Sequence, residues 1–356
     1  MKALNVYKNT KIYIIAPAKI ATGGPELLHQ LAYNLRTHLN IDTYIYYIPT
    51  KYKNPVHENY IEYSIPYTKN IIDKEENILI SPEIKLCIDL LDKFKKIRKA
   101  IWWLSVDNYK ITHAVYSKKH LLIKNIINRA FHFVTNKNIF DIQEEVLKNK
   151  NDFWQEKSLE NLNVNVHLCQ SRYAIDFLIK NGINTKKIYY LSDYLNQNFL
   201  KTQTNISKKE DIVAYNPQKG YLFTKKLIKK APEINFIPLI NMSRTDIIKT
   251  LQRSKVYIDF GHHPGKDRLP REAAILGCCV ITGKRGAASY SDDIPIPERY
   301  KFEDKEENIQ NIIFAIKYCF CNYTDLYNEF KLYREIIKNE YTKFIKDMLN
   351  IFSLCK

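Results

Sequence analysis

Glycine is scarce in this sequence, with nine among 356 residues. A chain that uses so little glycine should keep it where the backbone needs a positive φ or where another group approaches closely. Two of the nine form the pair Gly23-Gly24, and six more fall between residues 220 and 286. The scarcity therefore singles out two regions of the chain.

Long apolar runs and an apolar leader are also missing. Apolar stretches such as residues 273–283 have the length of a core element, well short of the roughly 20 residues that span a bilayer. The first residues soon reach a polar Lys-Asn-Thr-Lys run at 8–11, which is unlike the core of a signal peptide. We therefore expect a cytoplasmic protein.

Cysteine pairs with metal-binding or redox spacing are absent. The seven cysteines are an odd number, and no two of them form a Cys-x-x-Cys pair. Free, reduced and mostly buried thiols are the better interpretation than disulfides or zinc ligands. The adjacent His262 and His263 point in different directions and have no evident third ligand, so we expect no metal site.

Positive charge, in contrast, is abundant, and the formal net charge is +17. Such a charge favours phosphates, anionic lipid or nucleic acid as partners. A chain rich in Lys, Asn, Ile and Tyr can also carry it as a by-product of base composition. The basic residues are spread along the chain and interrupted by acidic ones, without the block that marks a nucleic-acid arm. We favour base composition for most of the charge and expect no nucleic-acid partner.

The chain is long enough for two domains, and its first half alternates strand and helix patterns. An apolar strand at 11–16, the glycine pair, a helix at 26–39 with leucines at helical spacing, and a strand at 43–48 form a βαβ unit. Residues 50–76 are polar and irregular. Further strands are expected at 77–81, 100–104, 164–168 and 188–191, and helices at 82–95 and 172–181.

A second α/β series follows a polar stretch at 196–210 that resembles a linker. Its expected strands are 211–215, 234–240, 256–260 and 279–282, and its expected helices are 221–230, 245–253 and 270–276. From about residue 308 the pattern is helical, with one long apolar face between Phe330 and Phe352. We place the domains at 1–200 and 207–329, followed by a C-terminal helix at 330–356.

Two short loops are candidates for phosphate contact. Gly23-Gly24 stands directly before a helix, where backbone amides and the helix dipole can face an anion, although an ordinary tight turn would look the same. Lys219, in the run Asn-Pro-Gln-Lys-Gly at 216–220, stands between a strand and a helix and can reach a phosphate oxygen. A surface lysine in a Pro/Gly turn is the alternative.

The richest segment runs from residue 261 to residue 286, where basic residues and glycines gather around one helix and one strand. Its basic residues are Lys266, Arg268, Arg271, Lys284 and Arg285. We expect Glu272 in the first turn of the helix, where its charge suits the dipole and its carboxylate can accept two hydrogen bonds from vicinal ribose hydroxyls.

The segment Pro-Arg-Glu-Ala-Ala-Ile-Leu-Gly at 270–277, with the strand after it, resembles the donor site of GT-B glycosyltransferases of the bacterial surface-polysaccharide type. Residues 101–109 and 191–194 are similar to other segments of these enzymes. The resemblance implies two Rossmann-like domains facing a cleft, and a C-terminal helix that crosses back to the N-terminal domain. It also implies an enzyme that transfers a sugar from a nucleotide-sugar donor to a glycan or lipid-linked acceptor, with no cofactor. Peripheral contact with the inner face of the membrane is a further option.

The resemblance assigns roles to individual residues. Glu272 matches the ribose-binding glutamate, Lys219 the phosphate lysine, and Gly23-Gly24 the N-domain glycine loop. The remaining donor-binding candidates are His263, Lys266 and Arg268.

The sequence also departs from the family pattern. His263-Pro264 stands where many retaining members have Glu-Pro, and no arginine precedes the phosphate lysine. The stereochemistry therefore stays open. An inverting reaction needs a general base, for which Asp107 and His113 are the candidates. A nucleotide-sugar epimerase of the same fold, a nucleic-acid-binding protein and a catalytically silent subunit are the rival interpretations.

Overall fold

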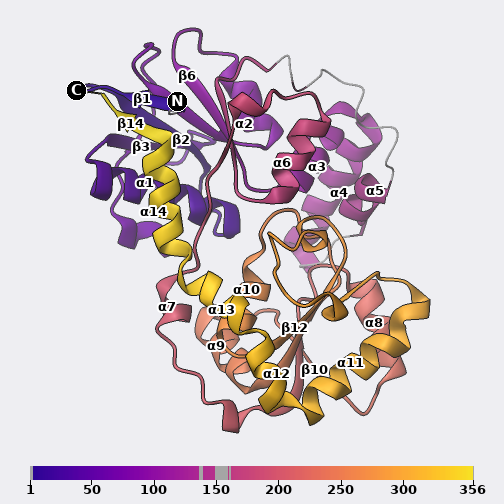
Figure 1. The fold of residues 1–356 in the computed structure, drawn as a ribbon. Helices are drawn as coiled ribbons and strands as arrows, with labels where there is room; N and C mark the ends of the chain where they lie inside the picture. The colour runs from indigo at the N-terminus through magenta and orange to yellow at the C-terminus, as the bar shows by residue number, and fades with distance from the viewer. Residues whose placement is uncertain (1–2, 136–138, 149–158, 160–161, 356) are drawn as a thin grey trace. The chain divides into compact units, whose positions relative to one another are not determined.

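The computed structural model describes residues 3–135, 139–148, 159 and 162–355 of the chain (Figure 1). These residues separate into two compact units, which are described in turn. Unit 1 comprises Met1–Gln170, Ala174–Leu191 and Ile345–Lys356, and unit 2 comprises Ser171–Tyr173 and Ser192–Phe344.

Unit 1 is built on a seven-stranded parallel sheet with the order β4-β3-β2-β5-β6-β7-β8. Its central strands are almost entirely buried because apolar residues occupy both faces, as a parallel sheet covered by helices requires. The strands are β2 (Lys11–Pro17), β3 (Asp42–Ile48), β4 (Tyr67–Thr68), β5 (Ile78–Pro82), β6 (Arg98–Trp103), β7 (Val166–Cys169) and β8 (Ile188–Tyr190).

The helices of unit 1 connect these strands. Helix α1 follows β2 directly and packs against β2 and β3, so the expected βαβ unit is confirmed. The helices are α1 (Gly23–Leu39), α2 (Lys85–Leu91), α3 (Val106–Ser117), α4 (Lys119–Thr135), α5 (Ile142–Lys148) and α6 (Arg172–Lys180). A short 3-10 helix, η1 (Glu58–Tyr63), and strand β4 lie in the stretch at 50–76 that was expected to be irregular.

Unit 2 contains a five-stranded parallel sheet with the order β10-β9-β11-β12-β13. Its strands are β9 (Glu210–Tyr215), β10 (Asn235–Pro238), β11 (Ser254–Asp259), β12 (Cys279–Gly283) and β13 (Lys301–Phe302). Its helices are α7 (Gln197–Leu200), α8 (Tyr221–Lys230), α9 (Arg244–Arg253), α10 (Arg268–Ile275), α11 (Ile309–Cys321), α12 (Tyr323–Glu329) and α13 (Lys331–Lys338).

The polar stretch at 196–210 belongs to unit 2 instead of linking the two units. Its last part is held by Lys209, which is 8% exposed and donates from Nζ to the carbonyl oxygens of Leu251, Ser254 and Leu276 at 2.7, 2.8 and 2.6 Å. The polar composition of this stretch suggested a linker. A sequence does not distinguish a buried lysine that donates to backbone carbonyls from a lysine exposed to solvent.

The C-terminal segment differs from the one long helix expected over 330–356. Helix α13 ends at Lys338, and α14 (Glu340–Ile351) follows after Asn339. The helical spacing of apolar residues continues across Asn339, so the sequence pattern did not reveal that the helix breaks there. Strand β14 (Phe352–Leu354) then pairs in parallel with β1 (Leu4–Val6), so the chain returns to unit 1 at its end.

Each of the two large sheets has one point at which the strand order reverses. In unit 1 the chain runs from β2 outward through β3 to β4 and then returns to β5 on the other side of β2. In unit 2 it runs from β9 to β10 and returns to β11. In open α/β sheets, ligands bind outside the carboxyl ends of the strands at such a reversal. The loops after β9 and β11, and those after β2 and β5, are therefore the places to examine.

Candidate functional site

In unit 2 the loops after β9 and β11 touch each other backbone to backbone. Gly220 has φ +58°, and a Cβ there would lie 2.6 Å from the carbonyl carbon of Phe260. A Cβ on Gly261 would lie 2.1 Å from Cβ of Lys219. Only glycine fits at either position, since such distances are below van der Waals contact. The two glycines bring Lys219 against the loop that follows β11.

Lys219 forms an ion pair with a carboxylate from this second loop. Its Nζ donates to Oδ2 of Asp267 at 2.6 Å, and the side chains of the two residues are 23% and 17% exposed. The lysine thus has a fixed position at the reversal of the sheet and retains part of its surface.

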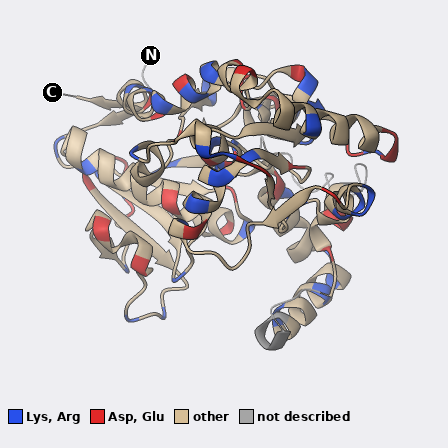
Figure 2. Ribbon diagram, turned by 90° about the horizontal axis from the view of Figure 1, so that it is seen from below, with Lys and Arg blue, Asp and Glu red and all other residues tan. Residues whose placement is uncertain are grey.

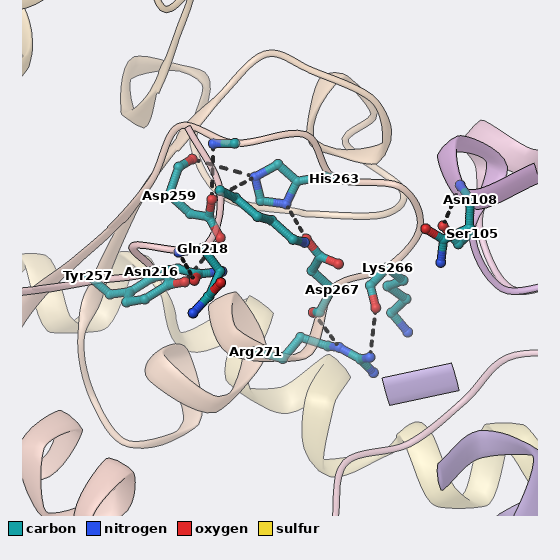
Figure 3. Close-up of polar contacts among 12 residues, drawn as sticks. Ser105, Asn108, Asn216, Gln218, Tyr257, Asp259, His263, Lys266, Asp267 and Arg271 are labelled. Carbon is teal, nitrogen blue, oxygen red and sulfur yellow. Dashed lines mark hydrogen bonds and ion pairs between the residues drawn. The ribbon is translucent and has the colours of Figure 1, made fainter. Parts of the chain in front are cut away.

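A row of buried groups continues from Asp267 (Figure 3). Nδ1 of His263 lies 3.1 Å from Oδ2 of Asp267, and Nε2 lies 3.8 Å from Oδ1 of Asp259. Asp259 also accepts from the hydroxyl of Tyr257 at 3.0 Å and from the backbone N–H of Gly261 at 3.1 Å. His263 is completely buried, so its ring contacts protein groups and not solvent.

The charges in this row stabilise one another. Burial disfavours a charged imidazole, but the carboxylates of Asp259 and Asp267 outweigh it and raise the pKa of His263 above its ordinary value. Burial likewise disfavours ionised Asp267, but Lys219 and His263 hold the pKa of that carboxyl well below its usual range. We call this group the Lys219 cluster: Lys219, Asp259, His263 and Asp267.

The Lys219 cluster also includes a group that could hold a cation. Among the described residues, ligand atoms of Asp259, His263 and Asp267 lie within 4.8 Å of one another. The sequence showed no third ligand near the histidine pair, because the two aspartates stand four residues before and after His263 and no spacing rule marked them. The ammonium of Lys219 already lies on Asp267, where it supplies the positive charge that a metal ion would bring.

Helix α10 begins at Arg268, two residues earlier than expected, with Asp267 at its N-cap position. An N-cap aspartate usually accepts a hydrogen bond from the first turn of its helix. No such bond forms here, because the Asp267 carboxylate turns to Lys219 and His263. The first N–H groups of α10 thus lack a side-chain cap, and Arg268 stands at the first helical position beside them.

Glu272 does not lie in the first turn of its helix. It is the fifth residue of α10, and the first turn holds no acidic residue, so the expected support from the helix dipole is wrong. Its side chain is largely buried, with 5% of the residue exposed. Whether it binds ribose stays a prediction.

Lys266 takes part in a buried ion network of unit 2. Its Nζ lies 2.9 Å from Oε1 of Glu340 and 3.7 Å from Oδ1 of Asp193. Arg271 joins the same two carboxylates, and both it and Asp193 are completely buried. The ammonium of Lys266 is therefore committed to protein carboxylates, and its expected contact with a donor stays a prediction.

Arg271 uses all five of its N–H donors in this network. Two go to the carboxylate of Asp193 at 3.1 and 2.5 Å, and one goes to Oε2 of Glu340 at 2.9 Å. The other two go to the carbonyl oxygens of Lys266 and Asp267 at 2.9 and 3.1 Å. Arg271 thereby fixes the backbone that carries Asp267, and through Asp267 it fixes Lys219.

In unit 1 the glycine pair lies inside a helix instead of in a loop before it. Gly23 and Gly24 are the first two residues of α1, and neither has a positive φ. A Cβ on Gly24 would meet Cδ1 of Leu104 at 3.7 Å, an ordinary contact. The hydroxyl of Tyr60 donates to the carbonyl of Thr22 at 3.2 Å and holds the start of α1 at the edge of the sheet.

The two candidate bases of unit 1 lie on α3 but not side by side. Asp107 is in the first turn and nearly buried, and the ring of His113 packs 4.1 Å from the ring of Tyr109. At about 100° per residue, six residues place the two side chains about 120° apart around the helix. The structure thus does not bring them to one reacting atom.

One further candidate base of unit 1, an acidic residue, was missed from the sequence. Glu83 follows β5 directly, is 2% exposed and accepts from the backbone N–H of Leu104 at 3.0 Å. Burial raises the pKa of Glu83 to about 7. The signal was present, since a carboxylate immediately after a buried strand falls at the edge where α/β proteins bind ligands.

The comparisons with known proteins give the fold. No protein-family model and no curated protein matches the chain. Solved structures do match: HepE of Anabaena in complex with UDP and glucose has a TM-score of 0.60 at 10% identity, covering 95% of this chain and 98% of that one. The lipopolysaccharide outer core galactosyltransferase WaaB has a TM-score of 0.55 at 11% identity, covering 96% and 98%.

A further match differs in length. S. aureus TarM, in a complex that contains UDP, has a TM-score of 0.50 at 15% identity, covering 79% of this chain. The match spans 56% of TarM. At such identities the likeness shows the fold, which is the GT-B class with two Rossmann-like domains that the sequence predicted.

Proposed function

We propose that this chain is a metal-independent glycosyltransferase. It would move a sugar from a nucleotide-sugar donor to a glycan or lipid-linked acceptor in bacterial surface polysaccharide synthesis. The observation that carries this proposal is the position of Lys219, which an ion pair holds at the strand-order reversal of unit 2. HepE was solved with UDP-glucose, which supports a uridine nucleotide as the first donor to try.

The charge of the reaction explains why Lys219 matters. The acceptor oxygen bonds to the anomeric carbon as the bond from that carbon to the phosphate oxygen breaks. The hydroxyl proton passes to a base or to the departing phosphate. Negative charge grows on that phosphate, and fixed cations and helix N–H groups stabilise it. Lys219, Arg268 and the uncapped N-terminus of α10 are the groups of unit 2 that suit this task.

The other candidate residues would have roles within their own units. Glu272 would hold the ribose hydroxyls. His263 and Lys266 would act indirectly, His263 through Asp267 and Lys266 through Glu340. The start of α1 in unit 1 would meet the donor phosphates or the acceptor. Asp107, His113 and Glu83 are the residues from which a general base would come if the reaction inverts the anomeric centre.

The test is a binding screen with a matched pair of variants. Nucleotides and nucleotide sugars are added to the full chain, and thermal stabilisation and affinity are measured. Lys219→Ala should weaken binding of the identified nucleotide by about 1.5–3 kcal/mol, roughly 10- to 150-fold. Lys226→Ala is the control, because Lys226 also pairs with a carboxylate, Glu306 at 2.8 Å, but lies exposed on α8.

Three results would overturn the proposal. They are the absence of binding by any nucleotide or nucleotide sugar, equal affinity of the Lys219 and Lys226 variants, and donor turnover that needs no acceptor. The last result would favour the epimerase.

A further inference from the structure

Asp267 places a carboxylate in the candidate phosphate site of unit 2. Its Oδ2 lies 2.6 Å from Nζ of Lys219, and its side chain is 17% exposed, so a ligand can approach both groups. Asp267 also stands at the N-cap of α10, and the N–H groups at the start of a helix attract anions. An anion that binds Lys219 or the start of α10 therefore meets the negative charge of Asp267 as well.

Two ordinary roles of a carboxylate in this position do not account for it. An N-cap aspartate accepts a hydrogen bond from the first turn of its helix, and Asp267 makes no such bond. A buried histidine needs a counter-charge, but Asp259 already lies 3.8 Å from Nε2 of His263, with 1% of its side chain exposed. Of the two carboxylates in the Lys219 cluster, Asp267 is the one that reaches the surface.

The carboxylate of Asp267 keeps its charge. The ammonium of Lys219 and the ring of His263, which Figure 3 shows facing the carboxylate, hold the pKa of Asp267 well below its usual range. An asparagine could also accept a hydrogen bond from Lys219, but it would bring no charge. The negative charge itself is therefore the feature that needs a function.

The substrate and the product of the proposed reaction differ in charge at the group that would bind here. In a nucleoside diphosphate sugar the terminal phosphate is esterified and carries one negative charge. In the free nucleoside diphosphate this phosphate ionises again with a pKa of about 6, so it carries about one more negative charge at neutral pH. A fixed carboxylate nearby disfavours the more highly charged ligand.

We infer that Asp267 is a specificity-determining residue that favours the nucleotide sugar over the free nucleoside diphosphate and so assists product release. This inference rests on the proposed function. Lys219 attracts both ligands, whereas Asp267 repels the product more strongly than the substrate. When the bond to the anomeric carbon breaks, its electron pair stays on the terminal phosphate, and this is the additional charge that Asp267 repels. The same repulsion opposes the transfer step, so the benefit of Asp267 lies in release.

The experiment compares two ligands that differ by one charge. One is the free nucleoside diphosphate, with UDP as the first to be used. The other is UDP methylated on its terminal phosphate, which has the charge of the nucleotide sugar without the sugar. Affinities for the full chain and for Asp267→Asn are measured at neutral pH. We expect the variant to bind UDP more tightly. Its gain for UDP should exceed its gain for the methyl ester by at least about fivefold, the effect of one unit charge about 4 Å away even at the dielectric constant of water.

The control variant is Asp211→Asn. Asp211 also lies 2.6 Å from a lysine, Lys255, but its side chain is 61% exposed at the start of β9. Both affinities should stay within about twofold of the unchanged chain, because a distant exposed charge is screened by solvent and salt. Melting temperatures establish that each variant is folded. If Asp267→Asn is too unstable, Asp267→Ser replaces it, because a serine hydroxyl can cap α10 without a charge, and the same preference is expected.

The results separate this inference from the proposed function. Equal changes for UDP and its methyl ester would overturn the inference alone, and so would weaker binding of both ligands by the folded variants. Asp267 would then only hold Lys219 in place, and the nucleotide site would stand. Absence of binding by any nucleotide would overturn the proposed function and the inference together.

Discussion

Lys219 and Asp267 stand 48 positions apart in the sequence, yet Nζ of the lysine lies 2.6 Å from Oδ2 of the aspartate. The pair joins the loop after β9 to the N-cap of α10. Asp267 holds the lysine at the strand-order reversal of unit 2, and the same carboxylate lies 3.1 Å from Nδ1 of His263. This relationship gives the candidate site its geometry, and its consequences can be measured.

Removing Asp267 should cost stability. Asp267→Ala leaves a buried histidine and a partly buried lysine without their shared counter-charge, so we expect a loss of about 3–5 kcal/mol in the free energy of unfolding. Denaturant titration measures it. The control is Asp211→Ala, because Asp211 also accepts from a lysine at 2.6 Å but its side chain is 61% exposed. An exposed pair contributes roughly 0–1 kcal/mol. Equal losses in the two variants would contradict a buried, coupled cluster.

The Lys219 cluster should make stability depend on pH in a defined direction. The pKa of His263 is raised in the folded state, so its contribution is complete below its ordinary value of about 6.5 and is lost as the pH rises through the folded value. The pKa of Asp267 is lowered, so its contribution is present above about pH 4 and is lost as the pH falls.

We therefore expect the stability difference between the unchanged chain and His263→Gln to be largest between about pH 4 and 6.5. The difference should shrink at alkaline pH. The groups that face His263 are Asp259, Asp267 and Lys219. Unfolding free energies of both proteins across the pH range test this, and a difference that grows above pH 7 would show that the imidazole is not held as a cation.

Replacing Arg271 by lysine should destabilise the protein even though the substitution keeps the positive charge. Arg271→Lys cannot reproduce five N–H donors in one plane, and it leaves buried carboxylate and carbonyl oxygens without partners. We expect a loss of at least about 2 kcal/mol. Arg253→Lys is the matched control, since Arg253 also binds one carboxylate, that of Glu210, through two nitrogens but is 58% exposed. A loss of less than about 0.5 kcal/mol is expected there.

The sequence predicted the fold well because local patterns determine it. Leucines at helical spacing and short apolar runs located α1 and most of the central strands, and helix α8 was expected with the bounds that it has. The stretch between β6 and β7 was left without assigned elements, and α3, α4 and α5 lie there.

The site was harder to predict, because its partners meet only in the folded chain. Lys219 was identified by its loop, but Asp267 was not identified as its partner. Arg271 was noted as one of several basic residues, and nothing local connected it to Asp193 or Glu340, which stand 78 and 69 positions away. The high net charge indicated little about the site. Figure 2 shows basic and acidic residues intermixed along the ribbon, as the sequence suggested.

Donor binding should not require a metal ion. The ammonium of Lys219 forms an ion pair with the carboxylate of Asp267. A metal ion bound by Asp259, His263 and Asp267 would need the same carboxylate as a ligand. Treatment with a chelator should therefore leave nucleotide affinity within about twofold, a difference of about 0.4 kcal/mol. Titration with Mn²⁺ or Zn²⁺ provides the opposing measurement, and a rise in melting temperature that Asp259→Asn abolishes would show that the cluster takes a metal.

The structure is compatible with two different roles for Glu272. It is the fifth residue of α10 and largely buried, so a helix-end charge effect no longer explains it. Two roles remain. A carboxylate that only supports the packing of unit 2 should affect stability and leave nucleotide binding alone. A carboxylate that accepts hydrogen bonds from ribose should affect nucleotide affinity and leave stability nearly unchanged.

Glu272→Gln distinguishes the two roles because it keeps the shape of the side chain and one acceptor oxygen. We expect its melting temperature to stay within a few degrees and its nucleotide affinity to fall by about 1.5–3 kcal/mol. The sharper comparison repeats the measurement with the 2′-deoxy form of the same nucleotide. If Glu272 binds the 2′-hydroxyl of the ribose, Glu272→Gln and the removal of that hydroxyl disrupt the same interaction. Their effects on affinity will then be less than additive. Additive effects, or a lower melting temperature with unchanged affinity, would assign Glu272 to packing and leave Lys219 as the main support for a donor site in unit 2.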